Sequence, residues 1–297
     1  MPKTKSKMIK NYSFSKDFYC LLTTLSIVFF IYSLSLFRPW QPFDERLIYN
    51  ETLFPIPTSF EETFEVIKTF VLNAHLESMN VYFSNHMTVR SDPVAWTILV
   101  FIFYLFKKNA LLYHLFQLII HLINTTLVWL ILNKTTKIIE DKETQLSNNF
   151  NKYKHFLISL FTLCWALHST NCEAVLLVTN WNALLTYTFS FSFLLYEITN
   201  IVNKNFKGSF LNYLIIVLLF TFSMFITEYG YTIPIILFFL NFSLAEYKHR
   251  ALKKNIEISI KRILPYLSGL LVFLFLSALK TNSGLNNFFR KIYIFFF

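Results

Sequence analysis

The sequence predicts an all-α membrane protein, a polytopic bundle of about seven transmembrane helices with one further helix at the membrane interface. Hydrophobic residues make up 55% of the 297 residues, and the mean hydropathy is +0.46. Several apolar stretches approach the roughly 20 residues that a helix needs to cross a bilayer. The cations behind the net charge of +10 lie between these stretches. We therefore expect the lipid bilayer as a partner, and no nucleic acid.

The chain begins with a basic segment at 1–17, followed by an apolar stretch at 18–37. This stretch is too long for a cleaved signal peptide, and no small-residue cleavage site follows it, which indicates a signal anchor. By the positive-inside rule the N-terminus is cytoplasmic, so the loop at 38–93 lies on the extracytoplasmic side. That region of the chain holds 8 of the 17 acidic residues.

Two apolar stretches follow, at 94–106 and 110–132, with only Lys107, Lys108 and Asn109 between them. The first has 13 residues, which is short for a span and favours an interfacial helix. If only the second stretch crosses, 18 of the 27 cations fall on the cytoplasmic side. If both cross, the later basic loops fall outside, which the positive-inside rule disfavours.

The remaining spans complete a transmembrane domain at 18–279, with no soluble domain. We expect them at 156–167, 174–196, 210–226, 231–244 and 263–279. Residues 280–297 form a short tail that ends in an apolar run too short to cross, and we expect this tail to be truncated.

Seven ionisable residues from separate parts of the chain fall on the extracytoplasmic face, or just beneath it, in this topology. They are Asp44, Glu45, His86, Arg90, His168, Glu173 and Glu228. Ionisable groups at membrane depth are costly and are candidates for function. The alternative roles are those of solvated loop residues, of a polar helical turn, of a headgroup anchor and of a structural hydrogen bond between helices.

His114 and His121 are seven residues apart in the stretch at 110–132, so they share one face of a helix. Packing or an interhelical hydrogen bond is the role that we expect for this pair. The sequence contains no pattern typical of a zinc site, a P-loop or a nucleophilic triad.

Four blocks of the sequence resemble membrane glycosyltransferases of the GT-C superfamily. Phe43-Asp44-Glu45 resembles the start of the first luminal loop in protein O-mannosyltransferases. The later blocks are similar to the tetratricopeptide-bearing, transmembrane O-mannosyltransferase-like proteins. These blocks are Tyr113-His114-Leu115 with His121, then His168 with Glu173-Ala174-Val175, and finally Glu228 with Thr232 and Pro234.

The resemblance implies a GT-C-like fold and an enzyme that moves a hexose, such as mannose, from a polyprenyl-phosphate donor to an acceptor hydroxyl on a protein or glycan. Asp44 would be the base that takes the hydroxyl proton. Arg90, with His86 and His168, would bind the lipid phosphate. Glu45 would hold Arg90 or help to bind a divalent metal, whose requirement stays open. Glu173 and Glu228 would orient the donor or the acceptor.

Departures from the family blocks support an alternative, a truncated or inactive GT-C-like protein. Ser169, Asn171 and Cys172 replace a proline, a histidine and a threonine of the second block, and Asn180-Trp181-Asn182-Ala183 lacks the arginine and carboxylate that follow it in the family. A transporter of a small solute or a lipid is a further alternative. Its signature would be broken helices and repeated halves, for which only Gly230 and Pro234 give a hint.

Overall fold

The structure, a computed structural model, describes residues 3–38, 57–72, 93–140, 147–177, 180–202, 210–226, 228–246 and 252–280. Within these ranges every regular element is helical, which confirms the all-α prediction. The chain divides into two compact units, and each is described by itself. Unit 1 consists of Met1–Arg46 and Lys108–Asn205, and unit 2 of Leu47–Lys107 and Phe206–Phe297.

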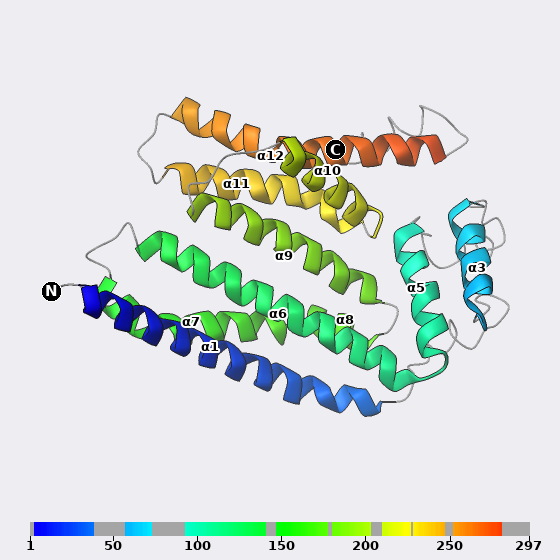
Figure 1. The fold of residues 1–297 in the computed structure, drawn as a ribbon, viewed down its shortest axis with the longest axis horizontal. Helices are drawn as coiled ribbons and strands as arrows, with labels where there is room; N and C mark the ends of the chain where they lie inside the picture. Colours follow the sequence, from blue (N-terminus) through cyan, green and yellow to red (C-terminus); the bar gives the residue numbers. More distant parts are fainter. Residues whose placement is uncertain are drawn as a thin grey trace. The chain divides into compact units, whose positions relative to one another are not determined.

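Unit 1 is built around one long helix, α6 (Figure 1). Its elements are α1 (Lys3–Ser33), η1 (Leu34–Phe37), α6 (Ala110–Glu140), α7 (Ser147–Ala166), α8 (Ser169–Leu176) and α9 (Trp181–Val202). Helix α6 packs against α1, η1, α7, α8 and α9, and its contact with α9 is the most extensive. The side chains of α6 therefore decide how unit 1 is held together.

The long helices of unit 1 run in alternating directions. At one end, Tyr32 of α1 contacts the ring of His121 in α6 and donates a hydrogen bond to Ala166 O in α7. At the other end, Asp17 of α1 contacts Asn133 of α6 and His155 of α7. Helix α6 is thus antiparallel to α1 and α7, and α9 runs in the direction of α6 (Figure 1). We name these two ends the Tyr32 end and the Asp17 end.

The apolar core of unit 1 lies toward the Tyr32 end. Five helices contribute to it, because small residues of α7 and α8 allow their backbones to approach the larger side chains of α1, α6 and α9. The buried members are Val28, Tyr32, Leu118, Ile120, Ala166, Ala174, Val175 and Leu184. This core brings the short helix α8 against α6.

One expected span, 174–196, is divided in the structure between α8 and α9. Helix α8 ends at Leu176, and the next residue is extended, with φ −96° and ψ 117°. The side chain of Gln117 donates to Ala174 O and Leu177 O. Gln117 thus adds a hydrogen bond to two carbonyl groups at the end of α8, and Leu177 O also accepts from Asn180 N. The polar residues Thr179, Asn180 and Asn182 interrupt the apolar pattern where the two helices are divided, and the contact with Gln117 lies beside this division.

Unit 2 contains a pair of shorter helices, α3 (Phe60–Leu72) and α5 (Pro93–Phe106), which pack against each other. Ser59 Oγ accepts from Glu62 N, and the Glu62 carboxylate accepts from the backbone N–H of Thr58, a variant of the capping box that starts a helix. The backbone hydrogen bond from Thr58 lowers the pKa of Glu62 below its ordinary value. Helix α5 ends before Lys107, whose φ of 50° turns the chain, so the expected break before residue 110 is confirmed.

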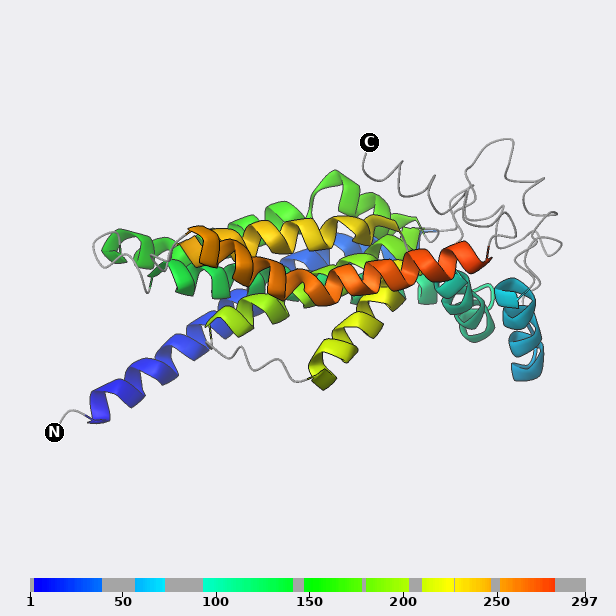
Figure 2. The ribbon, with the colours of Figure 1, turned by 90° about the horizontal axis from the view of Figure 1, so that it is seen from above.

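The rest of unit 2 is arranged on α12 (Leu252–Lys280), which packs against α10 (Phe210–Met224) and α11 (Ile233–Glu246). Figure 2 shows α10 running obliquely to α12. At their contact, a Cβ added to Gly269 would lie 3.0 Å from Val217 O and 3.0 Å from Phe220 Cδ1. The absence of a side chain at Gly269 therefore allows the two backbones to approach.

Three of the described helices are long and apolar enough to cross a membrane. The candidate spans are Lys16–Phe37, Ala110–Ile138 and Asn255–Leu276. Shorter apolar helices are found at Thr97–Phe106, Phe210–Met224 and Gly230–Ser243. The length and composition of these helices support a membrane protein.

Candidate functional site

The structure places three of the seven predicted site residues. Asp44, Glu45, His86 and Arg90 lie outside the described residues. His168 and Glu173 belong to unit 1, and Glu228 is the first residue of η3 (Glu228–Thr232) in unit 2. The predicted convergence of all seven residues therefore stays a prediction.

His168 and Glu173 lie at the Tyr32 end, and both side chains are exposed. His168 is the N-cap of α8, where its Nδ1 accepts a hydrogen bond of 3.3 Å from the backbone N–H of Thr170. Glu173 is one helical turn further along α8, and its backbone carbonyl accepts from Leu177 N. Both side chains can therefore meet groups from outside the helix bundle.

A row of buried polar side chains lies along one side of α6. We name His114, Gln117, His121 and Asn124 the polar face of α6. Their spacing of three, four and three residues places them on one side of a helix, and none is more than 1% exposed. Polar side chains buried in a membrane helix usually hold helices together or line a functional path.

Two members of this face hold the chain that leads from α7 into α9. The amide of Gln117 donates to Leu177 O at 2.6 Å and to Ala174 O at 3.1 Å. The Nε2 atom of His121 lies 3.1 Å from Ala166 O, to which it can only donate. The expected interhelical hydrogen bond is therefore confirmed for His121.

Asn124 joins α6 to α9 with both ends of its amide. Its nitrogen donates to Leu184 O at 2.8 Å, and its oxygen accepts from Thr188 Oγ1 at 2.8 Å. Because both groups of Asn124 have partners, this residue contributes to helix packing without an unmet hydrogen bond.

His114 is the member of this face nearest to the start of α6. Neither of its ring nitrogens makes a hydrogen bond with a described residue. The guanidinium of Arg38, which directly follows η1, interacts electrostatically with His114. Arg38 itself is exposed, so a cation stands between η1 and the acidic loop.

Aromatic rings surround His121 and fix its orientation. The ring of Trp165 stacks on His121 with centroids 5.7 Å apart, and Tyr32 meets it edge-on at 5.0 Å. The hydroxyl of Tyr32 also lies 3.0 Å from Cys172 Sγ. His121 is therefore a rigid part of the Tyr32 end.

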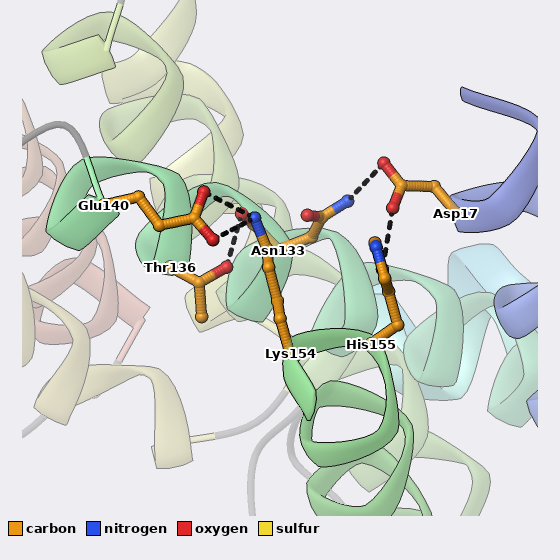
Figure 3. Close-up of polar contacts among 6 residues, drawn as sticks. All are labelled: Asp17, Asn133, Thr136, Glu140, Lys154 and His155. Atoms are coloured by element: carbon orange, nitrogen blue, oxygen red, sulfur yellow. Dashed lines mark hydrogen bonds and ion pairs between the residues drawn. The ribbon is translucent and has the colours of Figure 1, made fainter. Parts of the chain in front are cut away.

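A second polar cluster, the Asp17 cluster, occupies the opposite end of unit 1 (Figure 3). Asp17 Oδ1 lies 2.9 Å from His155 Nδ1, and its other oxygen accepts a long hydrogen bond of 3.5 Å from Asn133. Beside them, Lys154 Nζ lies 2.8 Å from both carboxylate oxygens of Glu140. The cluster thus links α1, α6 and α7 through two pairs of ionisable groups.

The charges of the Asp17 cluster balance only while His155 is neutral. Burial lowers the pKa of His155 below its ordinary value. The Asp17 and Glu140 carboxylates oppose this effect, whereas Lys16 and Lys154 add to it. Protonation of His155 would add a third cation to a group in which two carboxylates already face two lysines.

Neither cluster has the composition of a metal centre. Among the described residues, no group of three or more histidine, cysteine, aspartate or glutamate side chains could hold a metal ion. The carboxylates of Glu45 and Asp44 lie outside those residues, so a metal bound by the acidic loop stays a prediction.

The amide members of the polar face and the Asp17 cluster were not predicted from the sequence. Gln117 and Asn124 continue the spacing of His114 and His121, so a search for polar residues on one helical face would have found them. Asp17 and His155 offered no such signal, because they precede two separate apolar stretches.

The architecture brings two blocks of the GT-C resemblance together. The block at Tyr113–His121 lies in α6, and the block at His168–Val175 forms most of α8, which packs on α6. The last of the four blocks, which begins at Glu228, lies in unit 2. No protein-family model, curated protein or solved structure was found to match the chain.

Proposed function

We propose that this chain is a multi-pass membrane glycosyltransferase that moves a sugar from a polyprenyl-phosphate donor to an acceptor hydroxyl. The observation that carries the proposal is the packing of two family-like blocks at the Tyr32 end. Gln117 and His121 of the first block form hydrogen bonds with Ala174, Leu177 and Ala166 in and beside the second. Residues that are 45 to 60 positions apart in the sequence thus form one polar region.

The directions of α1 and α6 support an extracytoplasmic site. Because these helices are antiparallel, α1 ends and α6 begins at the Tyr32 end, and the intervening chain leaves and returns at that end. A chain segment that leaves and returns on one side of the membrane makes no net crossing of it. This agrees with an interfacial α5 and about seven spans in a GT-C-like arrangement. With a cytoplasmic N-terminus, the Tyr32 end faces the extracytoplasmic or luminal side.

The proposed chemistry needs a base and a group that stabilises the leaving phosphate. Asp44 takes the proton of the acceptor hydroxyl as the new bond forms. Arg90 pairs with the phosphate oxygens, for which a guanidinium is suited, and His86 and His168 add hydrogen bonds. Glu45 positions Arg90 or contributes to a metal site. Glu173 and Glu228 orient the donor or the acceptor.

The test is transfer of a radiolabelled sugar from a polyprenyl-phosphate donor by the purified full chain in lipid nanodiscs. Loss of a general base usually costs about 10²–10⁴-fold in rate, so we expect Asp44→Asn to reduce transfer by that order. Glu61→Gln is the matched control, since Glu61 is an exposed residue of α3 with no proposed role. Equal rates for Asp44→Asn and the unmodified chain would remove Asp44 as the base.

A non-catalytic GT-C-like protein is the second candidate, and one observation favours it. Asn171 stands where the family has a histidine, and its side chain donates to Trp165 O at 2.5 Å. Cys172 stands where the family has a threonine, and it contacts Tyr32. Both positions thus serve packing within unit 1. Absence of transfer by the unmodified chain, with several lipid-linked hexoses as donors, would support this candidate.

A further inference from the structure

Four buried polar atoms on the polar face of α6 make no hydrogen bond with any described residue. They are His114 Nδ1, His114 Nε2, Gln117 Oε1 and His121 Nδ1. Their side chains are at most 1% exposed, so bulk solvent cannot satisfy them. Buried polar atoms in proteins are usually bonded to protein or to an ordered water molecule. Three neighbouring residues whose buried polar atoms lack a hydrogen-bond partner indicate a shared binding site.

The contacts of Gln117 show which of its two side-chain polar atoms lacks a partner, and whether that atom donates or accepts a hydrogen bond. Its NH₂ group faces two carbonyl oxygens, Ala174 O and Leu177 O. The reverse orientation would put the amide oxygen against both of these acceptors, which is repulsive. Gln117 Oε1 is therefore the free atom, and it can only accept a hydrogen bond.

The same reasoning applies to His121. Its Nε2 faces Ala166 O and must carry the hydrogen of that contact. In a neutral imidazole the other nitrogen, Nδ1, then carries a lone pair and acts as an acceptor. Stacking on Trp165 and the edge contact with Tyr32 keep the ring from turning over.

Two acceptors on one helical face require a ligand that donates two hydrogens. Gln117 and His121 are four residues apart, and such side chains lie about 5–6 Å from each other at Cβ. His114, three residues before Gln117, offers one N–H and one acceptor when neutral. A ligand that donates to Gln117 and His121 and accepts from His114 makes about three hydrogen bonds, the usual number for a buried water.

We infer that His114, Gln117 and His121 bind an internal water molecule at the Tyr32 end of unit 1. The water joins three side chains of α6, inside the candidate span at Ala110–Ile138. A metal ion is disfavoured at this place, because the described residues offer no set of three strong ligands. The inference does not depend on transferase activity.

Radiolytic labelling of the full chain in nanodiscs tests the site, because X-ray pulses produce hydroxyl radicals from water wherever it is bound. We expect mass spectrometry to find rapid oxidation of His114 and His121, although both are buried. Met224 is the comparison, since it is fully buried and its sulfur is intrinsically reactive. Labelling of both histidines as slow as that of Met224 would overturn the inference.

Two variants separate bound water from general solvent leakage. Gln117→Leu removes one of the two acceptors, and we expect loss of most of the label at His121. Asn124→Leu is the matched control on the same face, and it should leave the label in place because Asn124 has its own protein partners. Equal loss of label in both variants would contradict a water held by Gln117.

The thermal stability of His114→Phe provides a measurement that does not rely on radicals. If water satisfies the imidazole, the apolar ring breaks a hydrogen bond and the melting temperature falls. If the nitrogens of His114 are without partners, their removal leaves the melting temperature unchanged or raises it. The second result would remove His114 from the site.

Discussion

Lys154 and Glu140 form a mostly buried ion pair in unit 1, whose side chains are 8% and 22% exposed. Removal of one partner leaves the other charge in a poorly solvated place, which is more costly than removal of both. We expect Lys154→Met to destabilise the protein by about 2–3 kcal/mol, after a discount for the partial exposure of Glu140. The double variant Lys154→Met, Glu140→Leu should recover part of this loss in a thermal melt.

A surface pair in unit 2 provides the control for that prediction. Lys261 and Glu257 are 2.6 Å apart, but their side chains are 63% and 58% exposed. Both residues precede the expected span at 263–279, and exposed pairs outside the lipid contribute little, because water and salt screen both charges. Lys261→Met should leave the melting temperature nearly unchanged. A loss equal to that of Lys154→Met would show that burial is not the cause.

The Asp17 cluster makes stability depend on pH through His155. The lowered pKa of His155 means that the folded protein binds this proton less readily than the unfolded chain does. The contribution is present above the ordinary pKa of 6.5 and is lost as the pH falls. We therefore expect the melting temperature to drop between about pH 7.5 and pH 5, and His155→Gln to flatten that drop.

His168→Asn is the control for the pH series. His168 is exposed and caps α8, and asparagine is also a good N-cap. The pH series of this variant is the background against which the slope of His155→Gln is compared. A pH profile of His155→Gln that matches the unmodified protein would exclude His155 as the titrating group.

At the scale of elements, we expect a glycine-to-alanine substitution to change stability by different amounts at Gly269 and at Gly230. Gly269→Ala would push a methyl group against the backbone oxygen of Val217 and the ring of Phe220. The overpacking cost of about 1–3 kcal/mol then outweighs a helix-propensity gain of about 1 kcal/mol. At Gly230 a new Cβ would be closer to its neighbour, 2.7 Å, but that neighbour is the flexible Met224 side chain.

We therefore expect Gly269→Ala to lower the melting temperature more than Gly230→Ala does. The order depends on which atom is contacted, since a thioether can rotate away and a helix backbone cannot. Thermal melts of both variants in one detergent would decide the order. The opposite ranking would mean that α10 and α12 can separate at little cost.

Hydrophobic pattern and charge predicted the helical elements well where each was bounded by polar residues. The break at Lys107–Asn109 and the short helix before it are of this kind. No proline or glycine marks the division of 174–196, but the polar residues Thr179, Asn180 and Asn182 stand at that place and are of types that favour turns and helix caps. The contact with Gln117 was not predictable, because Gln117 is 57 and 60 residues away from the two carbonyl groups that it binds.

Prediction of the candidate site was limited in the same way, because local patterns do not reveal contacts between distant parts of the chain. Spacing on one helix linked His114 with His121, and the structure confirms a hydrogen bond between helices for His121. The pairing of Asp17 with His155 depends on the packing of α1 against α7, which no local pattern indicates. The role of the acidic loop stays a prediction.

At the scale of the whole molecule, topology is the property on which the proposed site depends. Positions 140 and 170 lie at opposite ends of unit 1, near the Asp17 cluster and the start of α8. Reporters of membrane sidedness inserted at these two positions should therefore give opposite results, with 140 cytoplasmic. An extracytoplasmic result at 140 would place the proposed catalytic loop on the wrong side for a luminal donor.

The contact between Asp17 and His155 also has a consequence for biogenesis. The two residues are 138 positions apart, and a ribosome adds about 5–20 residues each second. After Asp17 is synthesised, about 7–28 s therefore pass before its partner exists. During that time the carboxylate, which lies in the expected cytoplasmic segment at 1–17, stays hydrated at the membrane surface. The packing of α1 against α7 through this contact is therefore a late step of assembly, after α6 and α7 have been made.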